Sequence, residues 1–246
     1  LNAVKTEVLW FSSVRRQLQI PDDLLMVGLD LVPPVRSVRD RGIFLDSDLS
    51  IRTHVTRTVA SCFAVLRQIR SISRSVSRSV LQSLIVSLVF SRLDYGSATL
   101  AGLPARLLDR LQSVLNAAAR LVYGSRKHDH VTPLLLDLHW LRVPERIAFR
   151  LAVLVYRCQH GVAPSYLAKE LHRVADVESR QRLRSAASTA LVVPKTVHSN
   201  IGDRSFCVTA ARVWNSLSPL VTSSPSLTVF RRRLKTELFM RCDHMT

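Results

Sequence analysis

Two close pairs of acidic residues are the positions where this sequence comes nearest to a centre for phosphoryl transfer. One pair is Asp22 and Asp23, and the other is Asp46 and Asp48. Two-metal catalysis needs carboxylates that hold two cations about 3.5–4 Å apart. Asp22 and Asp23 follow Pro21 in a polar stretch without the apolar strand that would fix them, and Asp48 stands where a helix cap is expected. The residues therefore predict no metal site at either pair.

Other common catalytic signatures are missing from the sequence or occur alone. It contains no nucleophile elbow of the form G-x-S-x-G and no glycine-rich phosphate loop. His128 and His130 flank Asp129, but alternating residues in a loop without further ligands are more often solvated than metal-bound. The cysteines are far apart, which predicts reduced, mostly buried thiols in an intracellular protein. They are Cys62, Cys158, Cys207 and Cys242.

Charge is the strongest signal in the composition. The 246 residues include 35 Lys and Arg against 18 Asp and Glu, which gives a net charge of +17 and a pI near 11.1. Such a chain attracts polyanions, and Arg binds phosphate through two parallel hydrogen bonds. The candidate partners are nucleic acid or an anionic membrane surface, and nucleic acid is favoured. No apolar run is long enough to span a bilayer, so we expect no membrane segment.

Hydrophobic spacing shows which elements would carry this charge. Between residues 50 and 70, apolar side chains recur every three or four positions, which predicts a helix capped by Asp48 or Ser50. The predicted fold class is mainly α with a small antiparallel β part at the N-terminus. Further predicted helices are 80–95, 103–124, 132–138, 145–160, 206–217 and 227–239; predicted strands are 4–12, 24–28 and 38–46; 190–194 is extended, and 176–188 is a linker or loop.

An ordered set of short sequences runs along nearly the whole chain. Residues 1–10 have the pattern L-N-x-x-K-T-E-x-L-W, and residues 91–95 are S-R-L-D-Y. The others are R-D-x-G-I-x-x-D at 39–46, L-Q-x-V-x-N-A-A-A-R-L at 111–121, L-H-W-L at 138–141 with R-I at 146–147, and shorter matches at 160–161, 163–167, 202–206 and 214–217. Together they resemble the reverse transcriptases of non-LTR (LINE-type) retrotransposons, in the style of jockey-like or chicken-repeat-like elements. Arg41, Gly96 and Arg142 stand where those proteins commonly have Leu, Cys and Pro.

The resemblance implies an architecture and a function for the parent protein. Residues 1–48 would be the end of the polymerase palm, 49–125 a thumb-like helical region, and 126–246 a C-terminal helical region. The parent would be an RNA-directed DNA polymerase of the nucleus and cytoplasm. Its catalytic Asp residues, which bind Mg²⁺, would lie upstream of Leu1, so this fragment would hold no cofactor and would be inactive alone. Its partners would be template–primer RNA and DNA and the rest of the reverse transcriptase polypeptide.

The resemblance also assigns roles to individual residues. Lys5 matches a lysine that acts in the parent enzyme as an auxiliary general acid for the departing pyrophosphate. Gly42 lies in a strand pair that would steady the primer end. The candidate phosphate contacts on and after the first long helix are Arg52, Arg57, Arg67, Arg70, Arg74 and Arg78; a solvated helix face is the alternative for each.

Several points stay open at the level of sequence. Trp140 and Trp214 follow apolar helical patterns and are expected in the core rather than stacked on bases. A buried polar network is a further possibility, made of Arg92, Asp94, Asn116 and Arg120. For the whole chain, the alternatives are a domesticated, non-catalytic RNA or protein interaction module and an unselected retroelement relic.

Overall fold

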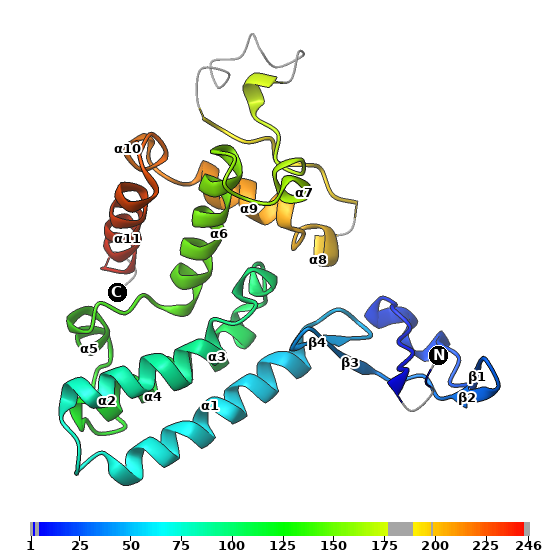
Figure 1. The fold of residues 1–246 in the computed structure, drawn as a ribbon, viewed down its shortest axis with the longest axis horizontal. Coiled ribbons are helices and arrows are strands. Elements are labelled where there is room, and N and C mark those ends of the chain that lie inside the picture. Colours follow the sequence, from blue (N-terminus) through cyan, green and yellow to red (C-terminus); the bar gives the residue numbers. More distant parts are fainter. Residues whose placement is uncertain (1, 3–4, 177–188, 198, 244–246) are drawn as a thin grey trace.

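The structure is a computed structural model that describes residues 2, 5–176, 189–197 and 199–243. It is mainly helical, with two small antiparallel hairpins near the N-terminus, as the sequence predicts. Figure 1 shows the hairpins at one end, a group of helices around α1 and α4 below, and a second group around α6, α9 and α11 above. The predicted linker at 176–188 falls almost entirely outside the described residues.

The N-terminal part consists of a 3-10 turn and two separate two-stranded sheets. In the first sheet Leu25 lies opposite Val32, and in the second Ser37 lies opposite Asp46. Strands are therefore confirmed at 24–28 and within 38–46, although 38–46 divides into two paired strands. The elements are η2 (Val14–Gln19), β1 (Leu25–Val27), β2 (Asp30–Val32), β3 (Ser37–Asp40) and β4 (Ile43–Asp46).

The prediction of a strand at 4–12 is wrong for the described part of that segment. Its one β-type pairing there is an isolated bridge between Val8 and Pro34. Trp10 and Phe11 are 42% and 54% exposed, so the apolar run is not buried. A strand needs a neighbouring ladder to satisfy its backbone groups, and no other described strand lies alongside this run.

The first group of helices surrounds one hydrophobic core. Helices α1 and α4 pack along each other, and Val55, Cys62, Val114 and Leu115 are among their fully buried side chains. The helix predicted at 80–95 begins as an α-helix, widens into a π-helical turn and ends in a short helix. The elements are α1 (Arg52–Ile72), α2 (Arg78–Ile85), the π-helix η3 (Val86–Phe90), α3 (Ser91–Leu93), the 3-10 helix η4 (Ser97–Leu100), α4 (Ala105–Tyr123) and α5 (Thr132–Asp137).

Helix α6 (Val143–Gln159) connects this core with a second one. Its Ile147 and Leu151 belong to the first core, whereas Val155 and Tyr156 pack with Phe230 in the second. The remaining elements are α7 (Ser165–Ala168), the 3-10 helix η5 (Val174–Asp176), α8 (Ser199–Gly202), α9 (Phe206–Asn215), α10 (Pro219–Thr222) and α11 (Leu227–Asp243). The domain boundary near residue 125 stays a prediction.

Asp46 and Ser50 share the cap at the start of α1, and Ser50 is one of the two predicted caps. The hydroxyl of Ser50 accepts the backbone N–H of Arg52 at 3.4 Å. A carboxylate oxygen of Asp46, at the end of β4, accepts hydrogen bonds from the backbone N–H of Thr53 at 3.0 Å and the hydroxyl of Ser50 at 3.1 Å. Asp48, the other predicted cap, instead accepts the backbone N–H of Ser50 at 3.0 Å.

Candidate nucleic-acid interface

A basic groove lies at the end of the α1–α4 pair farthest from the hairpins, and we call it the tip groove. The C-terminal end of α1, the turn after it and the C-terminal end of α4 form its walls, and it encloses about 910 Å³. Its apolar floor includes Phe63, Leu66 and Leu121. The basic lining residues are Arg67, Arg70, Arg74, Arg78, Arg120, Arg126 and Lys127, and no described carboxylate lines it.

Most of these cations are unpaired. Within the described residues, the charged groups of five of the seven make no ion pair or hydrogen bond, and these five are exposed: Arg67, Arg70, Arg74, Arg126 and Lys127. Arg78 is engaged, since it pairs with Asp137 at 3.0 Å and lies over the ring of Tyr123, 3.8 Å from its centroid. Arg120 donates to the backbone carbonyl of Asp129 at 3.1 Å. The five exposed cations are therefore free to bind an anion.

Helix dipoles offer an alternative reason for basic residues at this end. Arg70 and Arg120 lie in the last turns of α1 and α4, where a cation stabilises the partial negative charge of the helix terminus. Each terminus is equivalent to about half an elementary charge. The partial negative charges of the two helix termini therefore balance about one of the seven cations. The positive charge of the others remains to attract a polyanion.

The other candidate arginines of α1 lie elsewhere. Arg52 and Arg70 are 18 residues apart, which is five full helical turns, so they lie on the same face about 27 Å apart. Arg52 lines a different groove together with Arg106 and Arg110. Arg57 lies over the ring of Phe44, 4.3 Å from its centroid. The structure thus brings four of the six predicted arginines together at the tip and separates the other two.

Gly42 occupies the turn between β3 and β4 and lies against Tyr95. Its φ is +86°, and a Cβ there would meet the Tyr95 ring at 3.0 Å. The Tyr95 hydroxyl donates to the carbonyl of Arg41 at 2.5 Å. Arg41 is itself left-handed, φ 43°, with an exposed side chain. Gly42 therefore allows the hairpin to dock on the helices, and its contact with the primer end stays a prediction.

Lys5 is exposed in the N-terminal segment, where its backbone N–H donates to the carbonyl of Asn2 at 3.0 Å. Its ammonium group makes no ion pair or hydrogen bond with the residues that the structure describes.

Asp94 lies at the centre of a charge cluster that joins α6 to the first group of helices. Arg146 binds both of its carboxylate oxygens, one at 3.0 Å, and Arg150 binds one of them at 2.9 Å. The guanidinium of Arg146 also lies 4.5 Å from the centroid of Phe90. This contact links the S-R-L-D-Y sequence to the R-I pair 52 residues later.

The polar network predicted from Arg92, Asp94, Asn116 and Arg120 does not form. Arg92 donates to the carbonyl of Leu88 in its own helical segment. Asn116 accepts from Gln112, whose own oxygen accepts the N–H of Val143 and so caps α6. Asn116 and Arg120 share a face of α4, but Arg120 donates to the carbonyl of Asp129, and Asp94 binds Arg146 and Arg150 instead.

Trp140 and Trp214 are both in the core, as predicted. Trp140 is 6% exposed and meets Phe90 edge-on, whereas Trp214 is 1% exposed and stacks near Phe230. The indole N–H of Trp214 donates to the carbonyl of Thr189 at 2.9 Å. Neither ring is available to stack on a base.

The candidate metal-binding carboxylates have other partners. Oxygens of Asp46 and Asp48 bind the backbone and hydroxyl groups at the start of α1. Over the described ranges, no three His, Cys, Asp or Glu side chains gather as a metal site would require. The residues present do not fit the Mg²⁺ centre of a polymerase.

Two of the cysteines are buried thiols, as expected. Burial raises the pKa of Cys62 to about 11, against the opposing charge of Arg92, and also raises the pKa of Cys158. Cys207 is partly exposed, and the side chain of Cys242 lies outside the described part. The buried thiols are therefore poor nucleophiles near neutral pH.

Sequence reasoning missed three members of the tip groove, namely Arg120, Arg126 and Lys127. Arg120 lies within the A-A-A-R-L sequence, and the run R-K at 126–127 follows Gly124. A basic cluster just after a predicted helix end was the available signal. Only the packing of α4 along α1 places it beside Arg67 and Arg70.

None of the helices in the described ranges combines the length and apolar character needed to cross a bilayer. Comparison with protein-family models, curated proteins and solved structures found no match to this chain.

Proposed function

We propose that this chain is the end of the palm, the thumb and the C-terminal region of a non-LTR retrotransposon reverse transcriptase, and that it binds template–primer nucleic acid through phosphates. The observation that carries the proposal is the tip groove, where seven cations converge without a lining carboxylate among the described residues. Arginines on such a surface position a duplex without recognising its sequence.

The motifs that resemble this family support the proposal in a second way. The S-R-L-D-Y, L-Q and R-I sequences supply Asp94, Gln112 and Arg146, which join separate helices to one another. The matched sequence at 214–217 acts similarly, because its Asn215 exchanges two hydrogen bonds of 2.8 Å with the backbone of Leu191. A set of motif residues that positions helices is what a thumb-like region needs.

The exposed N-terminal surface fits contact with the rest of a polymerase palm, of which residues 1–48 would be the end. Apolar side chains on and around the first hairpin are strongly exposed, with Leu29 at 100%, Met26 at 73% and Leu31 at 57%. Apolar patches of this kind mark interaction surfaces. We propose that the rest of the reverse transcriptase polypeptide covers them and carries the catalytic Asp residues, the Mg²⁺ ions and the partner atoms for Lys5. The parent would act within the cell, in nucleus and cytoplasm.

Charge reversal in the tip groove tests the proposal. The triple variant Arg67→Glu, Arg70→Glu and Arg74→Glu should weaken binding of an RNA–DNA hybrid by at least about tenfold at 100 mM salt, because phosphate contacts dominate such affinities. Fluorescence anisotropy with a labelled blunt hybrid measures the change.

A matched control carries the same change in net charge at exposed positions away from the groove. The control variant is Arg15→Glu, Arg16→Glu and Lys169→Glu. The proposal expects this control to lose less than about threefold. Equal losses in the two variants would show that only net charge matters and would contradict a built interface.

The catalytic assignment has its own test. Coding sequence upstream of Leu1 should contain an Asp-Asp palm motif, and joining it to this chain should give primer extension that this chain alone lacks. An upstream stop or frame break would favour the relic, and salt-insensitive association with one protein partner would favour the domesticated module.

A further inference from the structure

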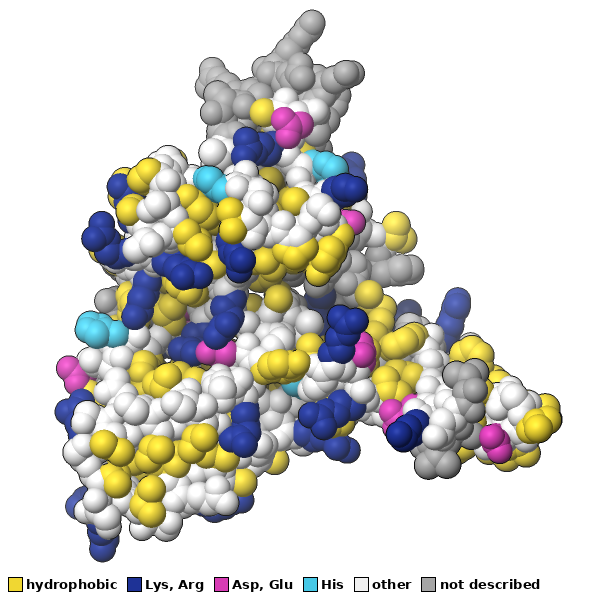
Figure 2. Space-filling model, in the orientation of Figure 1, with side chains coloured by type: hydrophobic (Ala, Val, Ile, Leu, Met, Phe, Trp, Pro, Cys, Tyr) yellow, Lys and Arg dark blue, Asp and Glu magenta, His cyan; other side chains and the backbone are white. Residues whose placement is uncertain are grey.

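A second basic groove runs between α6, α11 and the segment around Asp94, and we call it the inter-helix groove. It encloses about 690 Å³. Figure 2 shows Lys and Arg side chains gathered in the hollow between the upper and lower parts of the molecule, around an acidic side chain. Its cations are Arg146, Arg150 and Arg157 from α6, with Arg231 and Lys235 from α11.

The two helices face each other with matching stripes. On α6, Arg146, Phe149, Arg150, Val153 and Arg157 recur at three- and four-residue spacing, so they share one face. On α11, Arg231 and Lys235 are four residues apart, one position after the buried Phe230 and Leu234. The groove therefore has basic rims and a floor that includes half-buried Phe149 and Val153.

Charge within the groove is poorly balanced. Asp94 is its one described carboxylate, and Arg146 and Arg150 already occupy it. Arg157 makes a weak bond of 3.3 Å to the carbonyl of Val162, and the side chain of Arg231 has no polar partner in the described ranges. Like charges held on opposing walls repel each other, and a bound polyanion would relieve that repulsion.

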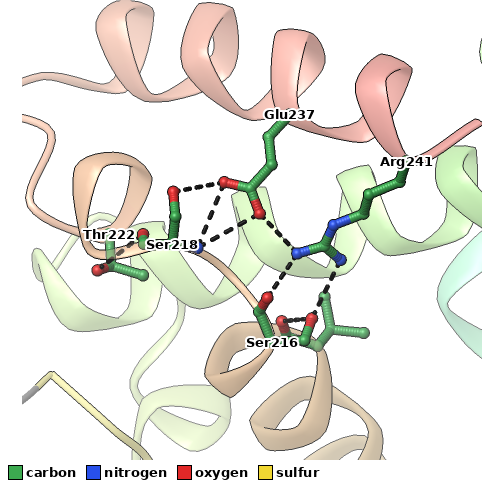
Figure 3. A network of polar contacts seen from close by, with 6 residues as sticks. Ser216, Ser218, Thr222, Glu237 and Arg241 are labelled. Atoms are coloured by element: carbon green, nitrogen blue, oxygen red, sulfur yellow. Dashed lines mark hydrogen bonds and ion pairs between the residues drawn. The ribbon is translucent and has the colours of Figure 1, made fainter. Parts of the chain in front are cut away.

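Contacts at the far end of α11 hold the groove open in this geometry. Figure 3 shows Glu237 accepting from the hydroxyl of Ser218 at 2.6 Å and from Arg241 at 2.5 Å. Arg241 also donates to the carbonyl of Ser216 at 2.5 Å. One turn earlier, Arg233 donates to the carbonyl of Leu220 at 2.8 Å. These bonds fix the rotation of α11 and keep Arg231 and Lys235 on the rim.

The lining of the groove selects its ligand. A duplex keeps its bases paired and stacked inside, so it could place phosphates on the basic rims but no base against Phe149. An unpaired strand can place phosphates on the rims and a base against the apolar floor, as in other single-strand sites. We infer that the inter-helix groove binds a single-stranded polynucleotide, at a site separate from the tip groove.

The test compares two probes on two sets of variants. The probes are a 12-nucleotide single strand, as oligouridylate and as oligothymidylate, and the blunt RNA–DNA hybrid. The variant Arg231→Glu with Lys235→Glu should weaken binding of at least one single strand tenfold or more and change hybrid binding less than twofold. The strand that responds identifies the ligand as RNA, DNA or both. The triple tip-groove variant should show the opposite pattern.

A control variant, Arg232→Glu with Lys169→Glu, has the same net charge and alters exposed residues outside the groove. The neutral variant Arg157→Gln with Arg231→Gln repeats the test without charge reversal, and ultraviolet cross-linking should locate oligouridylate on the peptide that contains Phe149. Single-strand binding equal to that of the control, or equal losses for both probes, would overturn the inference. Failure of the wild-type chain to bind the hybrid would instead contradict the proposed function. The single-strand measurements would still test the inter-helix groove.

Discussion

Single side chains decide which parts of this molecule are joined. Asp94 is 11% exposed at its side chain and holds Arg146, which is 18% exposed. Because both are largely removed from water, neither tolerates loss of its partner. The same arginine covers the ring of Phe90, which in turn meets Trp140, so the ion pair and the first core support each other.

Replacing Asp94 by Asn should therefore lower the free energy of unfolding by about 2–4 kcal/mol, because Arg146 would remain as a partly buried unpaired charge. Urea denaturation followed by circular dichroism measures it. Asp109→Asn is the control, since Asp109 is exposed on α4 and should change stability by less than about 0.5 kcal/mol. A loss at Asp94 no larger than at Asp109 would show that the pair does not hold α6 in place.

His54 is a second single residue with a marked effect, because it makes the stability of the fold depend on pH. Burial lowers its pKa below the ordinary 6.5, although nearby Asp46 opposes the shift. The fold thus favours the neutral ring, and this contribution to stability is complete above pH 6.5 and is lost as the pH falls. The free energy of unfolding, measured in urea at several pH values below neutrality, should therefore fall more steeply for the wild-type chain than for His54→Gln. Parallel pH profiles would contradict this role.

At the scale of elements, the β3–β4 hairpin is attached to the helices by its turn. The turn needs two left-handed residues, Arg41 and Gly42, and Tyr95 closes over it. The turn of the first hairpin contains Gly28, which has φ +71° and open space within 4 Å of the place that a Cβ would take. Substitutions at the two glycines can therefore distinguish the cost of backbone strain, which both positions share, from the cost of the contact with Tyr95, which only Gly42 makes.

Gly28→Ala should cost about 1 kcal/mol through backbone strain alone. Gly42→Ala should cost about 2–3 kcal/mol, because the new methyl group also meets the Tyr95 ring. Thermal and urea unfolding of both variants measures the difference. Equal losses would mean that the hairpin does not dock on Tyr95.

Sequence patterns predicted most helices because an apolar stripe at helical spacing is a local property. The stripe through Val55, Cys62 and Leu66 is buried as expected. The segment around Trp10 shows the opposite case, since an apolar run becomes a strand only beside another strand. Sequence also predicted four arginines of the tip groove. It could not place Arg120 beside Arg70, or Arg231 opposite Arg157, because both depend on how distant helices pack.

At the scale of the whole molecule, part of the positive charge is concentrated in two grooves. One concentration lies at the tip of the α1–α4 pair and the other between α6 and α11. Two separate basic grooves on one set of helices suit a chain that handles both a duplex and an unpaired strand. The exposed apolar hairpin at the other end would face the proposed rest of the palm.

The most direct measurement is the affinity of the intact chain for a blunt RNA–DNA hybrid between 50 and 300 mM salt. Each neutralised phosphate contributes about −0.9 to the slope of log K against log salt. The five unpaired cations of the tip groove therefore predict a slope of about −4 to −5. A slope near zero, or no binding at the lowest salt, would contradict the account.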